Sequence, residues 1–228
     1  MFNKKAVFIM ALALLTVYGL FPGDTATFVD LGFSRDGRFY MFGQHGVQTN
    51  TLRPWADLFV VDVAQNNFVS NGRHTYIHEN PVIAGQNGSG ALNRLIVQNA
   101  PLAERHQIDY NFQGLPLFIS LDNTDDSVSF RDFESGASYN ATLVSFIEGS
   151  GESLRSSFFI NLERTNRDGS NKSYIVGTPH FRRPQIASYR IQRVMVAPSD
   201  ASMIFVIEMR RWEGESFSIR YMVEAVRL

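Results

Sequence analysis

The feature that most constrains the fold is a period-two alternation of apolar and polar residues, clearest at residues 217–226. Five apolar positions there fall on one face, namely Phe217, Ile219, Tyr221, Val223 and Ala225. Polar positions fall on the other, namely Ser218, Arg220 and Glu224. Because successive side chains of a strand point to opposite faces, this pattern predicts a half-buried β-strand. Further strand candidates are residues 58–63, 128–133, 139–147, 158–163 and 189–196, and residues 33–42 fit a strand, a tight turn and a return strand.

Short polar segments separate several of these candidate strands. Residues 149–151 read Gly-Ser-Gly, and residues 166–171 read Asn-Arg-Asp-Gly-Ser-Asn, which is typical of hairpin connections. Residues 203–209 are nearly continuous in apolar side chains, as expected for a strand covered on both faces. The sequence therefore predicts a mainly β fold of antiparallel sheets, sandwich-like or partly propeller-like.

Residues 89–106 differ from the rest, because their apolar side chains have helical spacing. The apolar positions are Ala91, Leu92, Leu95 and Ile96. Ser89 stands at the expected N-cap, and Pro101 would kink the helix or open a second one. We expect this helical insertion to pack across a sheet. The glycine-rich loop at 85–90 lacks the Walker lysine and the dinucleotide spacing, so a plain connector is favoured and no cofactor is predicted.

The start of the chain predicts export. Lys4 and Lys5 precede an uncharged run of 16 residues, from position 6 to 21, which Pro22 and Gly23 close. The run is shorter than the 18 or more residues of a membrane-spanning helix, so a cleaved signal peptide at 1–23 is favoured over a retained anchor. We expect the mature chain to begin between Leu20 and Asp24. Residues 24–228 are then predicted to form a single mainly β domain, periplasmic or secreted.

Charge and cysteine content narrow the partners of the exported chain. Its 21 Lys and Arg balance 22 Asp and Glu, so it lacks the basic excess of a nucleic-acid-binding protein. There is no cysteine, and therefore neither a disulfide nor a site for a lipid anchor. We expect a partner that is a protein or an envelope component, no nucleic acid, and no stable membrane anchor after cleavage.

Two histidines four residues apart are the candidate metal ligands. On a strand, His74, Tyr76 and His78 would share a face, and Glu79 follows. Two imidazoles and a carboxylate could hold zinc. The H-E-x-x-H spacing is absent, so surface histidines are the favoured interpretation.

Residues 122–126 concentrate the carboxylate and amide oxygens that calcium prefers. The glycine and terminal glutamate of an EF-hand loop do not follow at their places. A turn between strands is therefore favoured over a calcium site.

Arg182 and Arg183 lie in the most cationic local stretch, which also contains His180 and Phe181. Guanidinium groups beside an aromatic ring could bind an anionic partner. A solvated loop whose arginines pair with nearby acids is the favoured interpretation.

Motifs for catalysis are absent from the sequence, which has no cysteine and no G-x-S-x-G elbow. A triad or carboxylate pair assembled from distant residues leaves no local signature. The favoured hypothesis is a non-catalytic binding or scaffolding module of the cell envelope. An exported hydrolase acting on an envelope polymer remains the alternative.

The hairpin at residues 33–42 begins Phe33-Ser34-Arg35-Asp36-Gly37-Arg38, and the strand after it contains Val61-Asp62. This unit resembles one blade of the TolB-type β-propeller, whose signature is F-S-x-D-G-K/R followed by a strand ending in V-D. Residues 197–206 repeat it in weaker form, with Asp200 matching Asp36. Because a propeller has at least four blades, two such units favour a compact antiparallel assembly over a closed propeller.

A second resemblance extends over most of the chain. Residues 30–34, 36–39, 42–48 and 55–63 together resemble the bacterial family called predicted secreted proteins, domain of unknown function 2259. The resemblance implies export and a common fold. It implies no catalytic residue, because the family has no assigned activity.

Overall fold

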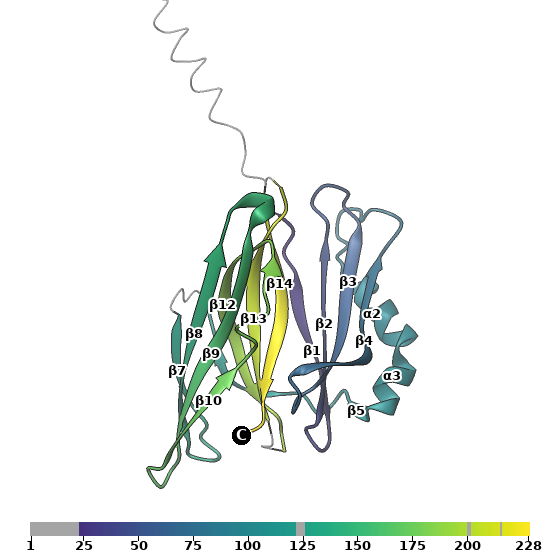
Figure 1. The fold of residues 1–228 in the computed structure, drawn as a ribbon. Coiled ribbons are helices and arrows are strands. Elements are labelled where there is room, and N and C mark those ends of the chain that lie inside the picture. Colours follow the sequence, from purple (N-terminus) through teal and green to yellow (C-terminus); the bar gives the residue numbers. More distant parts are fainter. Residues whose placement is uncertain (1–22, 122–125, 200–201, 215) are drawn as a thin grey trace, which may run out of the picture.

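Figure 1 shows a computed structural model of the chain, which describes residues 23–121, 126–199, 202–214 and 216–228. The predicted signal segment lies outside these residues except for Gly23. Residues 122–125 of the candidate calcium segment, and Asp200 of the second blade-like hairpin, also lie outside them.

Three antiparallel sheets make up the fold. The N-terminal sheet, in the order β4-β3-β2-β1-β5, contains β1 (Thr27–Ser34), β2 (Phe39–Val47), β3 (Pro54–Asp62), β4 (Asn67–Ile77) and β5 (Ile108–Asp109). The middle sheet, in the order β14-β13-β12-β6, contains β6 (Leu115–Ile119), β12 (Ile186–Val196), β13 (Met203–Trp212) and β14 (Phe217–Val226). The outer sheet, in the order β10-β9-β8-β7, contains β7 (Ser127–Arg131), β8 (Ser138–Glu148), β9 (Arg155–Thr165) and β10 (Asn171–Val176), with β11 (Arg183–Pro184) also on β9. These sheets confirm the predicted fold class.

The middle sheet lies between the other two, as Figure 1 shows. On β13, Phe205 and Ile207 pack into the cluster shared with the outer sheet, whereas Ile204 and Val206 pack against the N-terminal sheet. All four side chains are fully buried. The two-sided burial predicted for residues 203–209 is therefore confirmed over the first half of β13.

The strand predicted at residues 217–226 is confirmed, but its polar face is not open to solvent. Ser218 is 0% exposed and Glu224 is 3% exposed. The reason is that β14 belongs to the middle layer, so the side chains that alternate with the apolar set also meet protein. These buried polar groups need partners within the fold.

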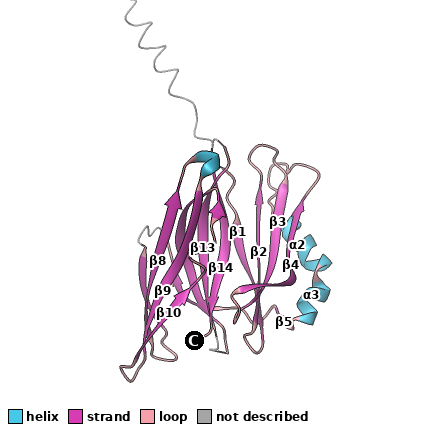
Figure 2. Cartoon of the chain, viewed as in Figure 1, coloured by secondary structure: helices cyan, strands magenta, loops and turns pink. Residues whose placement is uncertain are grey.

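The helical insertion forms α2 (Ser89–Gln98) and α3 (Ala100–Arg105), which cover the free face of the N-terminal sheet (Figure 2). Leu92 and Leu95 pack there against Leu58 of β3. A Cβ at Gly43 of β2 would lie 2.5 Å from Leu92 Cδ1, so the glycine lets α2 approach the sheet without displacing that side chain. Among the described residues, neither helix has the length and apolar character needed to span a membrane.

The predicted position of the N-cap is wrong by one residue. The cap is Gly88, and the Ser89 hydroxyl instead donates to Asn87 Oδ1 at 2.6 Å. Pro101 lies at the start of α3, where its missing N–H costs no helical hydrogen bond, so the second of its two predicted roles is confirmed.

Both blade-like segments are hairpins, which join β1 to β2 and β12 to β13. In the first, the Ser34 hydroxyl donates to Asp36 Oδ1 at 2.6 Å, and Gly37 takes a positive φ of 67°. The hairpins meet where the Ser202 hydroxyl donates to the Gly37 carbonyl at 3.3 Å. The resemblance to a propeller is not confirmed, because the described strands form three stacked sheets rather than a ring of blades.

Candidate functional site

A cleft of about 660 Å³ opens between the middle sheet and the N-terminal sheet. It lies at the end of the molecule where Gly23 enters the fold, the upper end in Figure 1. Residues from β3, β4 and the β2–β3 turn form one wall, and residues from the end of β13, the β13–β14 turn and β14 form the other. We call this feature the inter-sheet cleft.

The wall from the N-terminal sheet presents the carboxylate of Asp57. It accepts hydrogen bonds from Gln44 Nε2 at 3.0 Å and from the Thr75 hydroxyl at 2.7 Å. Gln44 is only 3% exposed, and its side-chain oxygen accepts a hydrogen bond from the backbone amide of Tyr221 at 2.8 Å. Because Tyr221 belongs to β14, the Asp57 carboxylate is held in place from both sheets.

The opposite wall presents Arg220. Its guanidinium lies 2.8 Å from Asp24 Oδ1 and 3.6 Å from Glu213 Oε1. It also lies 4.1 Å from the centre of the Trp55 ring, an arrangement that attracts a cation to the aromatic face. Glu213 accepts a further hydrogen bond from the Ser218 hydroxyl at 2.7 Å. This network provides partners for Ser218 and Arg220, two polar residues of β14.

The first described residues belong to the same site. The Ile219 amide donates to the Asp24 carbonyl at 2.9 Å, and the Ala26 amide donates to the Ile219 carbonyl at 3.1 Å. Asp24 is 7% exposed, and a Cβ at Gly23 would lie 2.3 Å from the Phe217 carbonyl oxygen. Residues from Asp24 onward are therefore part of the fold.

Anionic, cationic and neutral polar side chains all line the inter-sheet cleft. Its lining includes the carboxylates of Asp24, Asp57 and Glu213, the guanidinium groups of Arg211 and Arg220, and the side chains of Gln48, Asn50, Thr75 and Ser216. No histidine belongs to this described lining. Such a surface can donate and accept many hydrogen bonds. Its exposed apolar side chain is Ile77, whereas Trp55 in the same lining is only 5% exposed.

The two arginines predicted as binding residues lie in different environments. The Arg183 guanidinium is 3.1 Å from Glu224 Oε1, and their side chains are only 14% and 4% exposed. The same guanidinium lies over the Phe158 ring at 4.9 Å. Glu224 also accepts a hydrogen bond from Asn66 Nδ2 at 2.5 Å. Residues from all three sheets thus meet in one buried network.

Burial raises the pKa of the Glu224 carboxyl, and the Asn66 and Arg183 hydrogen bonds oppose that rise. The network therefore holds a carboxyl group that is costly to ionise, beside the cation that compensates for its charge. We interpret Arg183 as a structural residue that joins the sheets.

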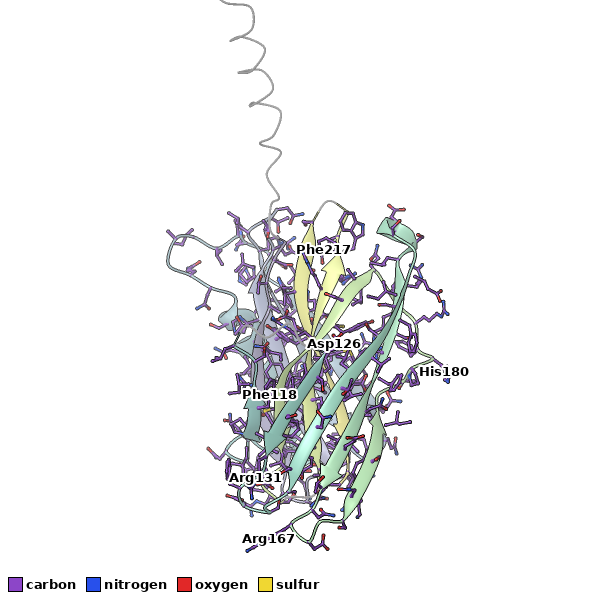
Figure 3. All side chains as sticks on the ribbon, turned by 90° about the vertical axis from the view of Figure 1, so that its left-hand side faces the viewer. Phe118, Asp126, Arg131, Arg167, His180 and Phe217 are labelled. Atoms are coloured by element: carbon purple, nitrogen blue, oxygen red, sulfur yellow. The ribbon has the colours of Figure 1, made fainter. Side chains whose placement is uncertain are left out.

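Arg182 is exposed and forms an ion pair with Glu148 of β8, whose side chain is also more than half exposed. Its neighbour His180 projects from the side of the molecule, as Figure 3 shows. Of the two arginines, Arg182 has the more accessible guanidinium. The hypothesis that Arg182 and Arg183 bind an anionic partner stays a prediction.

The two candidate metal-binding histidines make local contacts. His74 Nε2 is 2.8 Å from the Asn71 carbonyl oxygen, and the Asn80 amide donates to His78 Nδ1 at 3.1 Å. Across the described part of the chain, no three His, Asp or Glu side chains gather as a metal site would require. The zinc hypothesis for His74 and His78 therefore stays a prediction without a third ligand.

Sequence reasoning missed the inter-sheet cleft. Its charged residues come from segments far apart in the chain, and none of them belongs to a motif with an assigned role. Arg220 occupies a regular polar position of the alternating strand at residues 217–226, so the sequence does not mark it as a site residue. In a middle-layer strand, such a residue must find partners inside the fold or at a cleft.

Comparison with known protein families matches residues 41–227 to a family described as predicted secreted protein, domain of unknown function 2259. The searches of curated proteins and of solved structures gave no match. The matched residues include every named side chain of the cleft except Asp24.

Proposed function

The chain belongs to the family of predicted secreted proteins, domain of unknown function 2259, and we propose that it is a non-catalytic binding module whose ligand occupies the inter-sheet cleft. The membership confirms both the family resemblance and the secreted localisation predicted from the sequence. The observation that carries the proposal is that the polar groups of the cleft are held in place by contacts within the protein.

Asp57 shows how the cleft is held. Gln44 and Thr75 fix its carboxylate, and Gln44 is itself anchored on β14 by the Tyr221 amide. A site whose groups already have their final orientation loses less conformational entropy when a ligand binds. Concave sites with a few fixed polar groups and some apolar surface are typical of ligand binding.

The ion pairs and hydrogen bonds that the three carboxylates of the cleft make within the protein favour a binding function over a catalytic one. Asp24 and Glu213 both lie beside Arg220, and Asp57 accepts two hydrogen bonds. These contacts favour carboxylates that act as fixed hydrogen-bond acceptors. A general acid needs a different environment, in which the protonated carboxyl is favoured by an apolar surrounding.

The test is co-sedimentation of the exported chain with isolated, washed cell-wall polymer. We expect wild-type protein to sediment with the polymer and Asp57→Asn to bind about tenfold more weakly, since the fixed acceptor loses its charge. Asp168→Asn is the matched control, because Figure 3 places the neighbouring Arg167 at the opposite end of the molecule from Phe217. Equal binding by wild type and Asp57→Asn, or no sedimentation of wild type, would contradict the proposal.

A second candidate function is an exported hydrolase acting on an envelope polymer. The observation that favours it is that Asp24, Asp57 and Glu213 line the same cleft, since glycoside hydrolases use a pair of carboxyl groups. Hydrolysis predicts new reducing ends in the polymer when wild-type protein is added, and none with Glu213→Gln. A binding module releases no reducing ends in either case.

A further inference from the structure

The geometry points to a neutral, hydroxyl-rich chain, a glycan strand, as the ligand of the inter-sheet cleft. This inference rests on the proposed function, because it names the ligand class of the same site. Three properties of the cleft carry it: its charge balance, the kinds of groups it presents, and its mixture of polar and apolar surface.

The charge balance disfavours an anionic ligand. Three carboxylates and two guanidinium groups line the cleft. One of the two cations, Arg220, is engaged by Asp24 and Glu213, which leaves the exposed Arg211 opposite the half-buried Asp57. Binding a polyphosphate or an acidic peptide would require a surplus of positive charge that this surface lacks.

The hydrogen-bonding positions of the cleft that remain unoccupied suit a ligand with many hydroxyl groups. An ionised carboxylate offers about four lone-pair positions, and the hydrogen bonds to Asp57 from Gln44 and Thr75 occupy two of them. The remaining positions can accept ligand O–H groups in short, charge-assisted hydrogen bonds. The amides of Gln48 and Asn50 in the same lining can both donate and accept, as a ligand with mixed hydroxyl groups requires.

The apolar part of the cleft suits a sugar ring, which has a C–H face as well as hydroxyl edges. Ile77 is 42% exposed and lies on the same wall as Asp57 and Thr75. Trp55 forms part of the lining, and its buried indole N–H has no acceptor within the described structure. An acceptor that came within reach of this N–H through a small movement of the wall would satisfy it.

The experiment is titration calorimetry of the exported chain with four probes: an N-acetylglucosamine tetramer, a glucose tetramer, a short polyphosphate and a hexaglutamate peptide. We expect at least one of the neutral tetramers to bind, and we expect its Kd to change little between 50 and 500 mM salt, because no charge on the ligand is screened. Asp57→Asn should weaken this binding roughly tenfold, whereas Asp168→Asn should not change it. Thermal unfolding of both variants checks that each is folded.

The possible results test the inferred ligand class and the location of the site separately. If polyphosphate or hexaglutamate binds, and Asp57→Asn strengthens that binding, the cleft is the site but the inferred neutral ligand is wrong. If a neutral tetramer binds and Asp57→Asn leaves its Kd unchanged, the cleft is not the site, and the proposed function falls as well. If neither neutral tetramer binds at millimolar concentration while cell-wall polymer still binds through Asp57, the glycan inference is overturned and the proposed function stands.

Discussion

The replacement Arg183→Ala tests whether the buried network joins the three sheets. The change removes the guanidinium that lies 3.1 Å from Glu224 Oε1. It leaves that carboxylate, 4% exposed, with Asn66 as its side-chain partner within the described residues. It also removes the planar group packed over the Phe158 ring. An uncompensated charge would then be left between the sheets.

Removing one partner of a buried ion pair costs about 3–5 kcal/mol of unfolding free energy. For a chain of this length, 1 kcal/mol shifts Tm by roughly 2–4 °C, so Tm should fall by about 6–20 °C. The matched control is Arg182→Ala. Arg182 and Glu148 are both more than half exposed, and exposed pairs contribute about 0–1 kcal/mol.

The assay is urea and thermal unfolding of the exported chain at pH 7, for wild type, both single variants and Arg183→Ala/Glu224→Gln. We expect the double variant to be more stable than Arg183→Ala alone, because the neutral amide no longer carries an unpaired charge. Equal stability of Arg183→Ala and Arg182→Ala would refute the structural role of Arg183. It would also restore the case for Arg183 as a residue that contacts a partner.

Three further predictions concern pH, the helices and the mature terminus. Burial raises the pKa of the Glu224 carboxyl above its ordinary 4.5. The stabilisation linked to this shift is therefore present below pH 4.5 and is lost as pH rises through the folded-state pKa. Glu224→Gln should flatten this part of the curve of unfolding free energy against pH, and an unchanged curve would contradict the assignment. Leu95→Ala should cost about 2–5 kcal/mol in urea unfolding, because this side chain is 3% exposed between α2 and the N-terminal sheet; a loss below about 1 kcal/mol would mean that the helices are not packed as described. Mass spectrometry of the exported chain should find Asp24 retained at or near its N-terminus, and a chain beginning at Ala26 or later would show that the Asp24–Arg220 ion pair is not part of the mature fold.

The strands and helices could be predicted because their signals are local. Alternation marks residues 217–226 as a strand, and the unbroken apolar run marks residues 203–209 as a strand covered on both sides. The stacking of the sheets could not be predicted in the same way. It depends on which faces meet, and nothing near Ser218 or Glu224 in the sequence shows that another layer covers them.

The different environments of the two candidate arginines could not be predicted from the sequence either. Arg182 and Arg183 are adjacent, and their sequence context is the same. Where the chain joins the edge of β9, neighbouring side chains point in opposite directions, so Arg183 reaches Glu224 inside the fold and Arg182 reaches Glu148 on the surface. Only the fold distinguishes them.

The cleft could not be predicted because it is assembled from distant segments. Asp24, Asp57, Glu213 and Arg220 lie on different strands and turns, and they meet only when the middle sheet packs against the N-terminal sheet. Of these residues, Asp57 was part of a segment quoted for the family resemblance, but that resemblance implied no role for it.

Hydrogen–deuterium exchange can locate the ligand between the middle and N-terminal sheets. The exported chain is compared with and without washed cell-wall polymer. We predict slower exchange in peptides that contain Trp55 and Asp57, and in those that span the β13–β14 turn from Arg211 to Arg220. Slower exchange confined to the segment from His180 to Arg183, with the cleft peptides unchanged, would show that the ligand does not bind in the inter-sheet cleft.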